Sequence, residues 1–295
     1  MEQAHKAGFV SIIGKPNVGK STLMNAMVGE RLSIITSKAQ TTRHRIMGIL
    51  NGEHFQIVYS DTPGILDPQY ELHKYMMKFV HSSLEDADIV LLVKEINEKV
   101  AEEEIFKRLR NQTVPLFILL NKVDLSDQIE IERKMEEWKA FLPAKEVIPV
   151  SALNNYNVDK VFNTIVENLP VHPAYYPKDE LTDKPERFFA AEIIREKIFL
   201  NYSQEIPYSS QVVILLFKES EDIIRISAEI YVERESQKGI LIGKGGASLK
   251  KVGTQARKEL ETFFNKKVFL EQFVKVEPDW RKNEKKLRQF GFDTD

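Results

Sequence analysis

The segment Gly14-Lys15-Pro16-Asn17-Val18-Gly19-Lys20-Ser21 decides the fold of the first half of this chain. It matches the pattern G-x-x-x-x-G-K-[ST] and lies between an apolar strand predicted over residues 9–13 and a helix predicted over residues 21–28. Glycines let such a loop curl so that successive backbone N–H groups point at the α- and β-phosphates of a nucleotide. Lys20 would reach the β- and γ-phosphates, and the Ser21 hydroxyl would bind Mg²⁺. We therefore expect these eight residues and Thr22 to bind a nucleotide.

Short apolar segments alternate with amphipathic ones through the first 168 residues. The predicted strands cover residues 9–13, 55–59, 89–93, 116–120 and 147–150, and the predicted helices cover residues 21–28, 70–84, 98–110 and 129–141. This alternation predicts an α/β domain with a mostly parallel sheet and helices on both faces.

A second motif indicates that the nucleotide carries guanine. Asn121-Lys122-Val123-Asp124 follows the strand predicted over residues 116–120. The Asp124 carboxylate can accept hydrogen bonds from the N1–H and the exocyclic amine of guanine, whereas adenine has no matching donors. Asn121 would fix the loop, and the Lys122 stem would lie over the base. Ser151 and Ala152, after the strand predicted over residues 147–150, would offer backbone N–H groups to the guanine carbonyl.

Two polar segments are candidates for sensing the γ-phosphate. Asp61-Thr62-Pro63-Gly64 follows the strand predicted over residues 55–59, so Asp61 could hold Mg²⁺ through water and the Gly64 N–H could contact the phosphate. In the preceding polar stretch we prefer Thr42 to Thr41 as the residue that completes the Mg²⁺ shell. Ser21, Thr42 and Asp61 are then the predicted metal ligands, and Lys20, Thr42 and Gly64 the predicted catalytic groups.

These five segments, in this order on one sheet edge, resemble the translation-factor-related GTPases, in the branch of small bacterial G proteins. Ras-like GTPases have a glutamine after the D-x-x-G glycine to orient the attacking water, but this chain has Ile65 there. Three ways of orienting the attacking water remain open: a group from a partner, a monovalent cation, or the backbone and the substrate alone. Relatives that use K⁺ coordinate it through an asparagine at the position of Asn17, so K⁺ stimulation is a hypothesis for this chain.

The alternating pattern ends in a proline-rich stretch over residues 169–183, which contains Pro170, Pro173 and Pro177. We predict a nucleotide-binding domain over residues 1–170, a linker over residues 171–184 and a second domain over residues 185–295. In the second domain a helix over 186–201 precedes strands over 211–217 and 223–232, a helix pair, a strand over 267–276 and a basic helix over 280–290. Strands that follow one another directly predict an α+β domain with an antiparallel sheet.

The second domain contains a candidate site for nucleic acid. Gly243-Lys244-Gly245-Gly246 matches the G-x-x-G of KH domains, and a helix with Lys250 and Lys251 follows it. Such glycines let two helix ends approach, so that backbone N–H groups face the phosphates of about four nucleotides. The order of elements resembles the type II KH module. We therefore expect Gly243, Lys244, Gly245, Gly246, Lys250 and Lys251 to bind RNA.

Composition and charge agree with this division. The formal net charge is −2, but residues 238–288 carry 14 basic and 6 acidic side chains, a local charge of 14 − 6 = +8. A local basic block fits a phosphate-backbone partner. The chain has no Cys, which excludes disulfides, thiolate metal sites and cysteine nucleophiles. The apolar runs are too short to span a bilayer, and residues 1–8 lack the apolar core of a signal peptide, so we expect a cytoplasmic protein.

Taken together, the chain resembles the Era family of bacterial ribosome-assembly GTPases. The residues that carry the resemblance are 14–22, 38–45, 61–64, 121–124 and 232–246. The resemblance implies GTP hydrolysis and binding near the 3′ end of 16S rRNA on the small ribosomal subunit. Family members also associate peripherally with the inner membrane, which this sequence neither supports nor excludes. We expect a monomer, although the sequence itself leaves the oligomeric state open.

Two alternatives come from other functional classes. A membrane-linked or cell-cycle signalling GTPase could use the basic block to bind anionic lipid or a protein, but a lipid site would need no G-x-x-G. A GTPase with two G domains, or one that modifies tRNA, is not favoured, because the chain has one G-x-x-x-x-G-K-S motif and no terminal Cys.

Overall fold

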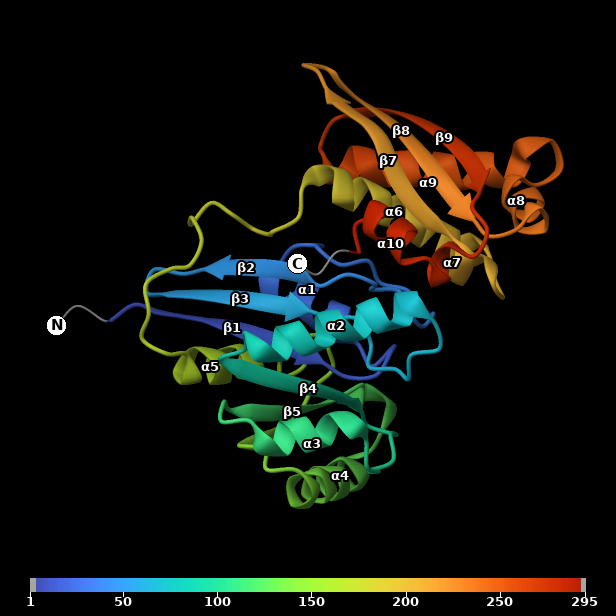
Figure 1. The fold of residues 1–295 in the computed structure, drawn as a ribbon. Coiled ribbons are helices and arrows are strands. Elements are labelled where there is room, and N and C mark those ends of the chain that lie inside the picture. Colours follow the sequence, from blue (N-terminus) through green and yellow to red (C-terminus); the bar gives the residue numbers. More distant parts are fainter. Residues whose placement is uncertain (1–3, 293–295) are drawn as a thin grey trace. The chain divides into compact units, whose positions relative to one another are not determined.

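A computed structural model describes residues 4–292 of the chain (Figure 1). The chain divides into two compact units, each of which is described separately. Unit 1 contains the residues up to Ile35 together with Thr42–Asp67 and Met76–Asp183, and unit 2 contains Thr36–Thr41, Pro68–Tyr75 and the residues from Lys184 onward.

Unit 1 is built on a six-stranded sheet in the order β2-β3-β1-β4-β5-β6. Its strands are β1 (Lys6–Ile13), β2 (Ile46–Asn51), β3 (Phe55–Asp61), β4 (Ile89–Glu95), β5 (Leu116–Asn121) and β6 (Glu146–Pro149). All pairs are parallel except β2 with β3, which is antiparallel. The predicted mostly parallel sheet is therefore confirmed.

The central strands β1, β4 and β5 are mostly apolar because both of their faces are covered. Five helices follow the strands, namely α1 (Lys20–Val28), α2 (Glu71–Glu85), α3 (Glu104–Asn111), α4 (Gln128–Phe141) and α5 (Val158–Asn168). Residues of α2, α3 and α4 share one hydrophobic core with β4 and β5, whereas α1 and α5 contact each other behind the sheet in the view of Figure 1. All six residues of β5 are buried, as expected of a strand inside a doubly covered parallel sheet.

Unit 2 is a three-stranded sheet packed on helices. Its elements are α6 (Glu186–Asn201), α7 (Ile206–Ser209), β7 (Gln211–Glu219), β8 (Ile223–Val232), α8 (Glu235–Ile242), α9 (Ala247–Phe263), β9 (Lys267–Val276) and α10 (Glu284–Gln289). The predicted antiparallel sheet is only half right. β7 and β8 are antiparallel, but β9 pairs with β8 in parallel, because the α8–α9 connection returns the chain to the starting end of β8 before β9 begins.

Several predicted elements need correction. Strand β2 and helix α5 were not expected, and the helix expected over residues 98–110 begins only at Glu104. Residues Glu98 and Glu103 lie in the connection before it because their carboxylates pair with Lys15 and Lys94. The basic helix expected over residues 280–290 is two short segments, a 3₁₀ turn over Trp280–Lys282 and α10, which meet at Asn283.

The proline-rich segment runs along the sheet of unit 1. Val171 bridges to Lys6 and Thr182 bridges to Gly48 in β2. Gln56 is buried, and its Oε1 accepts hydrogen bonds from the Tyr175 and Tyr176 N–H groups over 2.7 and 3.0 Å. Its Nε2 donates to the Tyr176 carbonyl over 2.8 Å. No helix among residues 4–292 is long and apolar enough to cross a membrane.

Candidate nucleotide site and RNA-binding groove

The predicted phosphate-binding loop joins β1 to α1. Gly14 has a φ of 151° and Gly19, the residue before α1, has a φ of 100°. A Cβ on Gly14 would lie 2.3 Å from the Val93 carbonyl oxygen, and one on Gly19 would lie 2.2 Å from the Asn121 Nδ2. Both positions therefore require glycine, for their backbone angles and for the space around them.

Lys20 is buried in this loop, as a phosphate-binding lysine needs to be. Its Nζ donates to the carbonyl oxygens of Gly14 and Lys15, over 3.0 and 2.8 Å. Burial lowers the pKa of Lys20 to about 8, against the opposing effect of Asp61. The β- and γ-phosphates would supply the negative charge that a buried ammonium needs.

The three predicted metal ligands lie together. Ser21 Oγ donates to Asp61 Oδ2 over 2.6 Å and lies 2.9 Å from Thr42 Oγ1. Asp61 Oδ1 is buried and has no hydrogen-bond partner among the described residues, and burial raises the pKa of Asp61. Two hydroxyls and a carboxylate with a free oxygen are the hard oxygen donors that Mg²⁺ prefers, so the residues present fit this ion.

The neighbouring threonine points to different partners. Thr41 Oγ1 donates to the Lys38 carbonyl and lies 2.7 Å from Thr36 Oγ1. Of the two threonines weighed from the sequence, only Thr42 therefore lies at the predicted metal site in this structure.

The D-x-x-G segment packs directly on the phosphate-binding loop. A Cβ on Gly64 would lie 2.5 Å from the Pro16 nitrogen, and the Ile65 N–H donates to the Gly14 carbonyl over 3.0 Å. Thr62 Oγ1 donates to the Ile12 carbonyl over 2.8 Å. The Ile65 side chain packs against the hydrophobic core of unit 1. An apolar, core-packed residue thus stands where a water-orienting glutamine occurs in Ras-like enzymes.

The predicted guanine-reading residues come together at the ends of β5 and β6. Asn121 connects three loops, because its Nδ2 donates to the Val18 carbonyl over 2.7 Å and its Oδ1 accepts from the Ala152 N–H over 2.9 Å. Ser151 Oγ donates to Asp124 Oδ1 over 2.5 Å. The Ala152 N–H, expected on the guanine carbonyl, is bonded here to Asn121.

The remaining two residues of the motif complete the same loop. Lys122 has a φ of 64° and its Nζ pairs with Glu95 over 2.7 Å. The Val123 N–H donates to the Val150 carbonyl over 3.3 Å. The loop after β5 is therefore tied both to β4 and to the end of β6.

Sequence reasoning missed a charged cluster beside the phosphate-binding loop. Lys15 Nζ lies 2.8 Å from Glu98 and 3.1 Å from Glu103, and fully buried Lys94 pairs with the same two carboxylates over 3.1 and 2.6 Å. The Lys94 ammonium also lies over the rings of Phe106 and Trp138. The side chain of Lys15, predicted to bind nucleotide, is thus engaged by glutamates. Acidic residues are common in this stretch, so no sequence signal separates these two from their neighbours.

In unit 2 the predicted RNA-binding glycines form the turn between α8 and α9. Gly243, Gly245 and Gly246 have φ values of 73°, 58° and 78°. A Cβ on Gly243 would lie 2.2 Å from Ser248 Oγ. Exposed Lys244 lies between these glycines.

A groove of about 370 Å³ begins at this turn and runs between α9 and β9. It is lined by Gly246, Leu249, Lys250, Gly253, Thr254, Arg257, Leu270 and Gln272. Lys250 lines the groove, whereas Lys251, also predicted to bind RNA, is exposed and does not line it. Neither Arg257 nor Gln272 was predicted: Arg257 is on α9 four residues after Gly253, whereas Gln272 is on β9 and reaches the groove only through the packing of that strand beside α9.

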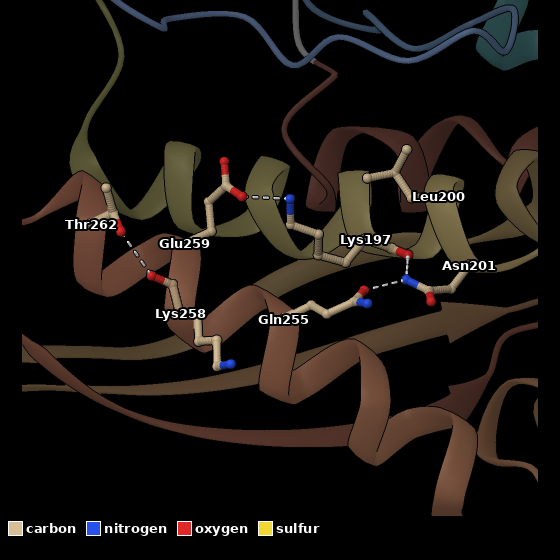
Figure 2. Close-up of a pocket in the computed structure, with 7 residues that line it drawn as sticks. All are labelled: Lys197, Leu200, Asn201, Gln255, Lys258, Glu259 and Thr262. Atoms are coloured by element: carbon tan, nitrogen blue, oxygen red, sulfur yellow. Dashed lines mark hydrogen bonds and ion pairs between the residues drawn. The ribbon is translucent and has the colours of Figure 1, made fainter.

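A larger hollow of about 590 Å³ lies between α6 and α9 (Figure 2). Four of its polar side chains pair with one another: Lys197 with Glu259 over 2.6 Å, and Asn201 with Gln255 over 2.6 Å. Lys258 and Thr262 also line the hollow.

The fold and the two sites define a P-loop GTPase carrying a KH domain. A family model described as 50S ribosome-binding GTPase matches residues 9–122, and a KH-domain model matches residues 205–281. A solved structure of Era in complex with MgGDPNP and nucleotides 1506–1542 of 16S ribosomal RNA is 39% identical, covers 98% of this chain and 99% of its own, and superposes with a TM-score of 0.94.

A second structure, a single-residue variant of Aquifex aeolicus Era bound to GDP and AlF4⁻, is also 39% identical with a TM-score of 0.94. It covers 97% of this chain and 99% of its own. The chain belongs to the Era family.

Proposed function

We propose that this protein binds and hydrolyses GTP with Mg²⁺ and binds 16S rRNA near its 3′ end during assembly of the small ribosomal subunit. The observation that carries the proposal is the likeness, over 98% of the chain, to an Era protein whose complex holds a GTP analogue, Mg²⁺ and that part of the RNA. The G-x-x-G turn and the groove beside it provide the corresponding RNA surface in this chain.

The name of one matching family model mentions the large subunit, whereas the RNA in the solved complex is 16S, from the small subunit. We give more weight to the complex. That family model matches only residues 9–122, whereas the KH-domain model matches residues 205–281. Contacts to RNA bases, rather than contacts to GTP, determine which RNA is bound.

The proposed chemistry assigns each group at the nucleotide site one task. Lys20 binds the β- and γ-phosphates, and Asp124 accepts the guanine N1–H and amine. Ser21, Thr42 and Asp61 would hold Mg²⁺, which neutralises charge on the phosphate oxygens. The Gly64 N–H contacts the γ-phosphate, so loss of that phosphate releases the segment that follows.

This chain has Ile65, not glutamine, at the position that orients the attacking water in Ras-like GTPases. We therefore further propose that K⁺, coordinated by Asn17, assists hydrolysis. Turnover should then be faster in KCl than in NaCl of equal concentration, and an Asn17→Ala variant should lose the difference. Equal rates in the two salts would remove K⁺ from the mechanism.

The proposal places the protein in the cytoplasm, where the small ribosomal subunit is assembled. Contact with the inner face of the membrane and a monomeric state remain predictions from the family resemblance. A membrane-signalling role is not favoured, because an anionic lipid headgroup would need neither the groove nor the G-x-x-G turn.

The testing experiment measures GTP turnover and RNA affinity together. RNA of nucleotides 1506–1542 should bind the protein more tightly than a scrambled RNA of the same length and composition. Turnover measured with each RNA then shows whether the RNA also accelerates hydrolysis. Equal affinity for the two RNAs would contradict the proposed RNA target without affecting the GTPase assignment.

A further inference from the structure

One residue interrupts the apolar inner face of strand β9. Alternate residues of β9 face the core of unit 2, and Val268, Leu270, Val274 and Val276 all belong to that core or pack against it. Gln272 occupies the middle position of the same row. A carboxamide is an unexpected choice there, because an apolar side chain would fit the row without leaving polar atoms to satisfy.

Two small residues make room for this side chain. Across the sheet Gln272 pairs with Ala228 of β8, and on the helix side it faces Gly253 of α9. A Cβ on Gly253 would lie only 2.5 Å from the Gln272 Oε1. Gly253 lies inside a 17-residue helix, where glycine is less stable than alanine. The chain therefore carries a helix-weakening residue that gives the carboxamide its space.

The carboxamide is incompletely satisfied by the protein. Gln272 Nε2 is buried and has no hydrogen-bond partner among the described residues. Buried polar groups are nearly always hydrogen-bonded in folded proteins, so an orphaned one beside a cavity indicates a missing partner. The cavity beside it is the groove of about 370 Å³.

Cationic side chains flank the same position along α9. Lys250 lies three residues before Gly253 and Arg257 four residues after it, and all three line the groove. The Arg257 guanidinium also pairs with Glu261 over 2.8 Å. Since residues three and four apart share a helix face, the two cations lie about one turn to either side of Gly253. β9 is also an edge strand, so an extended ligand could lie along it. A polynucleotide has the matching pattern of backbone charges with a hydrogen-bonding base between them.

We propose that Gln272 is a specificity-determining residue that reads one unpaired adenine of the bound RNA. The inference rests on the proposed RNA binding and goes beyond it by naming the base and the side chain. A carboxamide presents one acceptor and one donor in a plane, which matches the N6 amino group and the N7 acceptor of adenine. The flanking phosphates lie against Lys250 and the G-x-x-G turn, and the base enters the groove between Gly253 and Gln272.

The test compares base preferences rather than total affinity. RNA of nucleotides 1506–1542 is prepared with each unpaired adenine replaced in turn, and binding is measured by fluorescence anisotropy. For the unmodified protein, one replacement should weaken binding about tenfold or more, as expected for a lost bidentate base contact. In Gln272→Leu the same replacement should have no effect, while the rest of the profile is unchanged.

Two further variants guard against a purely structural effect. Gln272→Glu keeps the shape but removes the donor, so it should also lose the preference for adenine at that position. Gly253→Ala should do the same by displacing the carboxamide, although alanine strengthens the helix. Gln255→Leu is the matched control, because Gln255 lines the hollow on the other side of α9 (Figure 2) and should keep the full profile.

Two outcomes would overturn the inference: an unchanged profile in Gln272→Leu, or an equal weakening of all RNAs by that substitution. Failure of the proposed RNA binding is a separate outcome. The unmodified protein would then not distinguish the 16S RNA from a scrambled RNA.

Discussion

At the scale of single residues, the side chains predicted to read guanine orient one another through hydrogen bonds. Ser151 Oγ holds Asp124, and Asn121 connects the phosphate-binding loop to the loop after β6. Such fixed orientation makes discrimination depend on donors and acceptors more than on shape.

Asp124→Asn exchanges one acceptor oxygen for a donor. GTP affinity should fall about a hundredfold, because two hydrogen bonds to a charged acceptor are lost. Affinity for xanthosine triphosphate should rise, since its second ring carbonyl can accept from the new amide. Competition binding with the two nucleotides measures the change, and undiminished GTP affinity would contradict the base-reading role.

Thr42 and Thr41 provide a matched pair for the metal site. Thr42→Ala should slow Mg²⁺-dependent turnover about tenfold or more, a loss of roughly 1.4 kcal/mol of transition-state stabilisation. Thr41→Ala removes the same atoms from a side chain that bonds to Thr36 and Lys38, so it should have a smaller effect. Turnover titrated with Mg²⁺ measures both, and equal losses would contradict the assignment of Thr42.

At the scale of elements, the turn between α8 and α9 determines where a phosphate backbone can approach. The turn needs positive φ at three glycines, and a side chain on Gly245 or Gly246 would meet open space. Aspartate tolerates a left-handed backbone better than most residues, so it can be introduced there with little strain.

Gly245→Asp should therefore weaken RNA binding at least tenfold, an expectation of roughly 1.4 kcal/mol for a negative charge at the phosphates. Gly291→Asp is the control, because Gly291 has a φ of 85° and equally open surroundings in the same unit but lies outside the groove. Thermal unfolding of both variants checks that they fold. Unchanged RNA affinity in Gly245→Asp would exclude the turn from the binding site.

The accuracy of sequence prediction also differed between elements for physical reasons. Helix α6 and strand β9 have the bounds expected, because their apolar pattern matches their burial. Strand β2 was missed because it is an edge strand with Gly48 in its middle, so its pattern is weak. Helix α3 begins late because the ion pairs of Glu98 and Glu103 override local helical preference.

At the scale of the whole molecule, charge is unevenly distributed along a chain whose net charge is only −2. Residues 238–288 carry a charge of +8, from 14 basic and 6 acidic side chains. RNA binding by this block should therefore be strongly salt-dependent although the protein as a whole is slightly acidic.

With Lys244, Lys250 and Arg257 each meeting one phosphate, the logarithm of RNA affinity should fall with the logarithm of salt with a slope of about −2. Lys244→Ala should reduce that slope by about 0.7, and affinity should fall equally for all RNA sequences. Measuring the RNA affinity of both proteins between about 50 and 200 mM salt gives the two slopes. A slope near zero would mean that the basic block does not bind the phosphate backbone.

The sequence by itself predicted a GTPase domain followed by a KH domain, which the family models confirm, and it named the candidate nucleotide-binding residues. These residues occupy short contiguous motifs, whose glycines and polar groups follow directly from what phosphates, Mg²⁺ and guanine require. Only the tertiary structure showed that Thr42 rather than Thr41 joins Ser21 and Asp61, that glutamates hold Lys15, and that Gln272 faces Gly253 across a groove. Those relations depend on strand pairing and on partners far apart in the chain, which local sequence patterns do not encode.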